Sequence, residues 1–182
     1  MAILGTRNLP ARAAYLSQRN KMDSLHDLYD RYAADVYRFA LYLSGDPTDA
    51  EDITADTFVR LWSATGEIRL PSVKAYLLTI ARHLYVDGQR ARARFTELDP
   101  ELASGERSVE DRTAARSQMQ FLLKSMRQLA EGDRAALLMR TGGLPYDEIA
   151  LSLGISVNAA KVRVHRARKR LMGAQSTQET RS

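Results

Sequence analysis

The stretch LPYDEIALSLGIS, residues 144–156, decides the fold class of this sequence. Pro145 favours the start of a helix, Gly154 favours a tight turn, and Ser156 is a typical N-cap for a second helix. Ile149 falls where an apolar side chain would face the interior of a small helical domain. The stretch therefore predicts a helix-turn-helix.

The helix expected after Ser156 combines an apolar stripe with a basic outer face. Its apolar residues recur at steps of three and four and are expected to be buried: Val157, Ala160, Val164, Ala167 and Leu171. Cationic side chains reach phosphates and guanine edges in the major groove, and asparagine can address adenine. We therefore expect DNA contacts from Asn158, Lys161, Arg163, His165 and Arg166. The alternatives are a solvated helix face and a surface that binds a protein partner.

Helical periodicity also dominates the rest of the chain, and no convincing alternating strand interrupts it. Gly45 suits the end of a first helix, Asp46-Pro47 the start of a second, and Ser72 the cap of a third. The inner faces of these helices are expected to include Leu28, Tyr29, Val36, Phe39, Leu43, Ile53, Phe58, Leu61, Trp62, Tyr76, Leu77 and Ile80. A short further helix is expected from Asp133 to Arg140. The fold class is therefore predicted as all-α.

Two small helical domains are expected, joined by a flexible linker, with the helix-turn-helix in the second. The polar segment 95–113 contains Pro100 and Gly105 and lacks helical periodicity, so it is interpreted as the linker. The domains are placed at residues 23–94 and 114–172. Residues 1–22 and 173–182 are interpreted as tails.

Composition excludes several classes of function. The chain has 182 residues, a formal net charge of +5, three histidines and no cysteine, so a disulfide framework and thiolate metal sites are excluded. With neither a phosphate-binding glycine loop nor a paired catalytic motif, no catalytic site, metal site or cofactor is expected. No apolar run is long enough to cross a bilayer, and no export signal is evident, so a soluble cytoplasmic protein is expected.

Four segments, in this order and spacing, resemble an extracytoplasmic-function (group four) bacterial sigma factor. They are LYDRYAADVYRFALYL from residue 28, AEDITADTFVRLW from residue 50, AYLLTIARHLYVDGQRARAR from residue 75 and LPYDEIALSLGISVNAAKVRVHRARKRL from residue 144. The resemblance covers about residues 25–171.

The resemblance implies a function in transcription initiation, in response to stress or an envelope signal. The domain at 23–94 would be sigma region two, which docks on the clamp of the largest subunit of core RNA polymerase and melts the minus-ten element. The domain at 114–172 would be region four, which reads the minus-thirty-five element and sits on the flap of the second-largest subunit. An anti-sigma factor is the further partner implied.

The resemblance also implies where the minus-ten element is met. The helix after Ser72 leads into a basic segment expected to face this DNA, with contacts from Thr79, His83, Asp87 and Arg90. The loop 63–71 matches the family loop that takes in a flipped base, although an ordinary connector is the alternative. Two departures stand out on this helix: Tyr76 replaces the usual tryptophan, and His83 stands where asparagine is common. A solvated helix residue without a DNA role is the alternative for His83.

Three acidic residues are expected to contact core polymerase. Asp49, Asp52 and Asp56 recur at steps of three and four, so they share one helix face that suits a basic partner. Complementing the helix dipole is an alternative for Asp49 but not for Asp56. Ala55 replaces the glutamine usual in the family, which removes one polar docking contact.

One rival interpretation is a stand-alone helix-turn-helix regulator, which would bind a palindromic site as a dimer without polymerase. The acidic docking face and the second basic helix argue against it.

Overall fold

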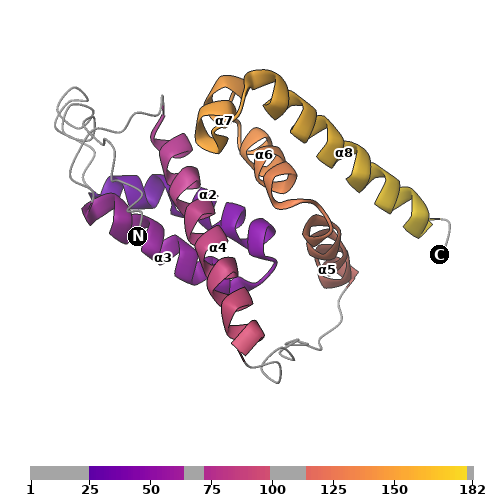
Figure 1. Cartoon of the computed structure of the whole chain (residues 1–182), viewed down its shortest axis with the longest axis horizontal. Coiled ribbons are helices and arrows are strands. Elements are labelled where there is room, and N and C mark those ends of the chain that lie inside the picture. The colour runs from indigo at the N-terminus through magenta and orange to yellow at the C-terminus, as the bar shows by residue number, and fades with distance from the viewer. Residues whose placement is uncertain (1–24, 64–71, 99–113, 180–182) are drawn as a thin grey trace.

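The structure is a computed structural model that describes residues 25–63, 72–98 and 114–179. Helices and turns make up these residues, and they contain no strand (Figure 1). In chain order the helices are α2 (Leu25–Ser44), α3 (Pro47–Ser63), α4 (Val73–Leu98), α5 (Ala114–Arg127), α6 (Glu131–Thr141), α7 (Tyr146–Leu153) and α8 (Val157–Glu179). The prediction of an all-α fold is confirmed.

The N-termini of three helices are capped where the sequence places a capping residue. The Asp46 carboxylate accepts backbone N–H bonds from Thr48 at 2.8 Å and Asp49 at 3.1 Å at the start of α3. The Ser72 and Ser156 hydroxyls each accept the N–H three residues later, at 3.2 Å, and so begin α4 and α8. Each cap satisfies donors that the first turn of a helix leaves unpaired.

The turn between α7 and α8 depends on Gly154, whose φ of +64° and ψ of +39° lie in the left-handed region. A side chain with a Cβ would be strained there. The N–H of Ile155 then bonds to the carbonyl of Ala150 at 3.0 Å, which closes the end of α7. The predicted helix-turn-helix is therefore formed by α7 and α8.

The helices form two groups that pack against each other (Figure 1). In the first group, α2, α3 and α4 pack on one another around Val36, Leu43, Leu61, Leu77 and Leu78. In the second, α6, α7 and α8 enclose Met139, Ile149 and Val164. Contacts of α2 with α5 and α6, and of α4 with α6 and α7, join the groups, so the buried residues form one continuous cluster.

Some helix bounds and some burial differ from the expectation. Helix α4 continues to Leu98, into the segment predicted as linker, and α8 continues to Glu179, into the predicted tail. Tyr29, Trp62 and Val157 were expected to be buried but are 48%, 67% and 40% exposed. Val157 is the first residue of α8, so no preceding turn covers it. The Tyr29 ring still contacts Phe58, with ring centroids 4.8 Å apart.

Candidate nucleic-acid interface

Helix α8 presents one face to the core and the opposite face outward. Ala160, Val164 and Ala167 are fully or almost fully buried against the second helical group. With 3.6 residues per turn, the side directly opposite this stripe carries Asn158, Val162, His165 and Lys169, all of them exposed. Helix α8 runs along the outer edge of the molecule (Figure 1), so this row is accessible to a large partner.

Val162 is the member of the outer row that the sequence analysis did not select. Its side chain is 59% exposed although it is apolar. The signal was present in the pattern, because Val162 lies half a turn from the buried stripe. An apolar residue does not match the polar and basic pattern typical of DNA contacts, so composition alone does not indicate Val162.

The five residues predicted to contact DNA do not all lie in the outer row. Asn158 and His165 are in it, whereas Lys161 lies on the α7 side of α8, with its Nζ 5.9 Å from the centre of the Tyr146 ring. The same ring lies 4.8 Å from the Arg140 guanidinium. Lys161 is exposed but has a preferred position beside an aromatic face.

Arg163 and Arg166 lie on the opposite flank of α8 and reach the first turn of α6. The Arg163 guanidinium rests on Gly132, where an added Cβ would lie 2.1 Å from Nη1. Arg166 donates from Nε to one carboxylate oxygen of Asp133 at 2.5 Å, and from Nη2 to the other oxygen. This bidentate pair raises the pKa of Arg166, chiefly through its hydrogen bonds to Asp133.

Asp133 is therefore part of the candidate site, although the sequence pattern does not indicate it. It is only 1% exposed, although an acidic residue in the first turn of a short helix usually faces water. Its partner lies 33 residues later in the chain, beyond the range of any helical spacing. No local sequence pattern could have found this pair.

The four residues predicted to contact the minus-ten element lie along α4. The Thr79 hydroxyl donates to the carbonyl of Ala75 at 2.7 Å, and the residue is half-buried. Asp87 and Arg90 form an exposed ion pair of 3.8 Å. His83 lies between Thr79 and Asp87 along the helix and is exposed over part of its surface. The loop 64–71 lies outside the described residues.

His83 has an environment that disfavours the charged imidazolium. Partial burial lowers its pKa, and the positive charge of Arg82 lowers it further. Asp87 and Glu131 raise it, and Arg60 lowers it, by smaller amounts. This lowered pKa favours the neutral imidazole, in which one nitrogen is a donor and the other an acceptor.

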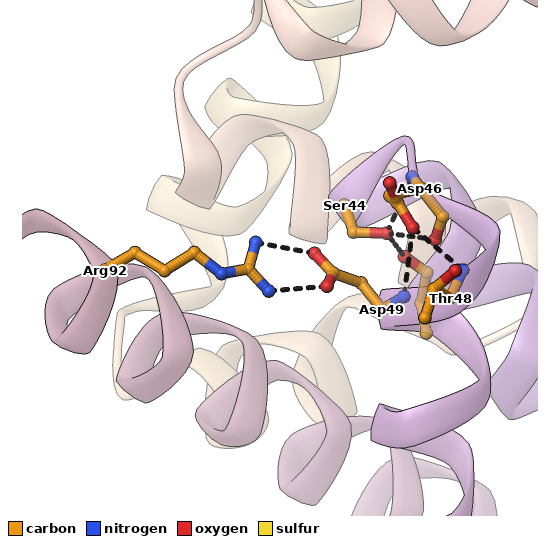
Figure 2. A network of polar contacts seen from close by, with 6 residues as sticks. Ser44, Asp46, Thr48, Asp49 and Arg92 are labelled. Atoms are coloured by element: carbon orange, nitrogen blue, oxygen red, sulfur yellow. Dashed lines mark hydrogen bonds and ion pairs between the residues drawn. The ribbon is translucent and has the colours of Figure 1, made fainter. Parts of the chain in front are cut away.

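The three acidic residues of α3 differ in their availability. Asp49 receives two hydrogen bonds from Arg92 of α4, one of them 2.7 Å long (Figure 2). The pair raises the pKa of Arg92 and ties α4 to the capped first turn of α3. Asp52 and Asp56 are exposed beside a shallow hollow that Gly88 and Gln89 of α4 also line. Asp52 and Asp56 thus form the accessible part of the acidic face.

The described ranges contain neither a candidate membrane-spanning helix nor a candidate metal-binding cluster. No helix in residues 25–63, 72–98 and 114–179 has both the length and the apolar character to cross a membrane. The same part of the chain has no cluster of three or more histidine, aspartate or glutamate residues that could hold a metal ion.

The sequence matches two family models. Sigma-70 region 2 matches residues 28–95, which include α2, α3 and most of α4. Sigma-70, region 4 matches residues 122–171, which include α6, α7 and the basic face of α8. The two matches therefore fall on the two helical groups described above.

Two relatives are similar to this chain over most of their length. The ECF RNA polymerase sigma factor SigL of Mycobacterium tuberculosis is 32% identical over 147 residues, which cover 77% of this chain and 82% of the relative. The ECF RNA polymerase sigma factor EcfG of Rhodopseudomonas palustris is 31% identical over 152 residues, covering 82% and 83%. Among solved structures, the sigma factor RpoE of Bartonella quintana, in complex with the anti-sigma factor NepR, aligns with a TM-score of 0.72 at 25% identity, covering 83% of this chain and 96% of that one.

Proposed function

The chain belongs to the sigma-70 family, among the ECF RNA polymerase sigma factors. From this membership we propose which helices contact the polymerase and which contact each promoter element. As a sigma factor it binds core RNA polymerase and directs it to promoters. The assignment of individual residues to that work is our proposal.

Helix α8 reads the minus-thirty-five element. The observation that carries this assignment is the exposed basic face of α8 directly after the left-handed Gly154 turn. A helix placed in this way enters the major groove, where the side chains of its exposed face and flanks can meet base edges and phosphates. Contacts come from Asn158, Lys161, Arg163, His165 and Arg166.

Helices α3 and α4 bind the polymerase and the minus-ten element. Asp52 and Asp56 dock on the basic clamp of the largest subunit, and Asp49 supports them by fixing Arg92. Thr79, His83, Asp87 and Arg90 lie along one helix and meet the melted minus-ten strand. The second helical group rests on the flap of the second-largest subunit.

An anti-sigma protein controls this activity by covering surfaces that the polymerase needs. The supporting observation is that a sigma factor of similar structure was solved in complex with an anti-sigma factor. Because a sigma factor works where core polymerase and the chromosome are, we place the protein in the cytoplasm.

Dependence on polymerase tests the proposal. Each helical group presents only a modest basic face, so promoter DNA should be bound specifically by the complex with core polymerase and not by the isolated chain. The measurement is a gel shift with and without core enzyme, followed by transcription in vitro and mapping of the start sites. Tight, sequence-specific binding by the isolated chain to a palindromic site would instead identify a stand-alone regulator.

A further inference from the structure

The pair between Asp133 and Arg166 joins a buried carboxylate to a partly exposed cation. Asp133 is 1% exposed, whereas the Arg166 side chain is 50% exposed. A buried carboxylate needs hydrogen bonds to both oxygens, and Arg166 supplies one to each. The pair therefore fixes one side of the guanidinium and leaves the other side accessible.

The donors that Asp133 leaves unused form a second binding edge. A guanidinium has five N–H groups in a planar fork, and Asp133 takes the Nε–H and one N–H of Nη2. The remaining N–H of Nη2 and those of Nη1 lie on the terminal edge of the group. Two parallel donors on such an edge match the O6 and N7 acceptors of guanine in the major groove.

The location of Arg166 on α8 suits this role. It follows His165 and lies one turn after Val162, both of which belong to the exposed outer row. On the same flank, Arg163 packs on Gly132, beside Asp133. The first turn of α6 thus holds two arginines of α8, but only Arg166 has a carboxylate to fix the plane of its guanidinium.

We propose that Asp133 is a positioning residue, which holds the Arg166 guanidinium by one side so that its terminal edge reads one guanine of the minus-thirty-five element. This inference rests on the proposed function of α8. A long arginine side chain loses rotamer freedom when it binds a base, and a residue that orders it beforehand removes part of that cost. Asp133 therefore contributes to sequence preference without touching DNA.

The test compares holoenzymes that contain Arg166→Ala, Asp133→Asn or both substitutions. Each is titrated with a panel of promoters in which every minus-thirty-five position is changed singly. Arg166→Ala should lose on the order of ten- to a hundredfold in affinity for the preferred promoter and should stop discriminating at one guanine position. Asp133→Asn should lose less affinity, but at the same position, and the double variant should behave like Arg166→Ala alone.

Two further variants separate this role from a merely structural one. Arg166→Lys still offers a charge to Asp133, so it should keep the melting temperature, yet it should lose discrimination at the same guanine because it lacks a planar two-donor edge. Arg170→Ala, on the exposed side of α8, is the matched control and should weaken all promoters alike.

The outcomes are distinct. If Asp133→Asn and Arg166→Lys weaken every promoter equally, or leave discrimination intact, the positioning role is wrong and the pair is only a tie between α6 and α8. If substitutions on α8, including Arg170→Ala, leave promoter binding unchanged while core binding persists, the proposed function of α8 is itself wrong.

Discussion

His83 lies on α4 directly after Arg82, whose guanidinium binds Glu131 of α6 through hydrogen bonds of 2.7 and 2.9 Å. Burial and the Arg82 charge both lower the pKa of His83. The neutral ring then offers DNA one donor and one acceptor, whereas an asparagine amide suits base edges of a different pattern. We therefore expect the identity of this residue to influence which promoters are opened.

Replacing His83 by asparagine should change which minus-ten sequences are melted and leave the affinity for core polymerase unchanged. Permanganate footprinting on a panel of minus-ten variants measures the melting preference. Identical preferences in both proteins would mean that His83 has no DNA role.

The pH dependence of stability gives a second check on the environment of His83. Because the folded pKa is lowered, the unfolded chain binds more protons than the folded chain as the pH falls below about 6.5. The contribution of His83 to the free energy of unfolding is therefore present above that pH and is lost as the pH falls through the lowered value. Wild type should lose more stability than His83→Asn between about pH 7 and pH 5, measured by urea unfolding. Parallel curves would contradict the lowered pKa.

At the scale of single elements, the acidic face of α3 contains one aspartate that is paired within the chain and two that are exposed. Asp49 lies in the first turn, and its carboxylate is bound by Arg92, so it stabilises the packing of α3 against α4. Asp52 and Asp56 follow on the same face and stay exposed. Spacing alone predicts all three as equivalent, because it does not reveal that Arg92, 43 residues away, reaches Asp49.

Charge reversal of Asp52 and Asp56 to lysine should weaken binding to core polymerase by about tenfold or more, since two attractions to a basic clamp become repulsions. Both side chains are exposed, so helicity by circular dichroism should be unchanged. Glu51→Lys is the matched control, because Glu51 is exposed on the same helix but lies outside this face. Unchanged core affinity of the double variant, with normal helicity, would contradict the docking assignment.

Local signals predicted the elements well, and tertiary contacts limited the prediction of the site. The caps at Asp46, Ser72 and Ser156 and the turn at Gly154 act within a few residues, so the sequence reveals them. The Asp133 carboxylate that binds Arg166 lies on another helix and is buried, so helical periodicity does not predict the pair.

At the scale of the whole molecule, polar contacts join the two helical groups. Arg82 binds Glu131, the Ser72 hydroxyl bonds to the Glu148 carboxylate at 2.5 Å, and the Arg127 guanidinium donates to the carbonyl of Gly45. The sequence predicts two small helical domains joined by a linker, and each apolar stripe indicates only that a helix has a buried face. It does not indicate which helix of the other group packs against that face. Polar side chains that are distant in the sequence determine this packing.

Arg134 of α6 is a further polar side chain between the two helical groups, and it is only 5% exposed. Its Nη2 donates to the Tyr85 hydroxyl at 2.9 Å, its Nη1 donates to the carbonyl of Met126 at 3.3 Å, and its guanidinium lies 5.6 Å from the centre of the Tyr85 ring. Within the described residues, its Nε has no hydrogen-bond partner. Loss of the Tyr85 hydroxyl would therefore remove one of the two hydrogen bonds that the Arg134 guanidinium makes to described residues.

Tyr85→Phe should lower the free energy of unfolding by about 1–3 kcal/mol, because it keeps the ring but leaves a buried donor without its acceptor. Urea unfolding followed by circular dichroism measures the change. Tyr37→Phe, at a partly buried tyrosine of α2, is the matched control and should cost less. Equal stabilities of Tyr85→Phe and wild type would mean that the hydroxyl contributes nothing to the contact between the groups.

The burial of Arg82 and Arg134 between α4 and α6 also limits how strongly the affinity for DNA depends on salt concentration. With side-chain exposure of 18% for Arg82 and residue exposure of 5% for Arg134, neither cation can displace counterions from a phosphate backbone while the helical groups stay together. Each cation brought to DNA adds about 0.9 to the slope of log affinity against log salt concentration. A form in which α4 and α6 have separated should therefore show a steeper dependence of log affinity on log salt concentration. The size of the increase would give the number of arginines that have become available to phosphates.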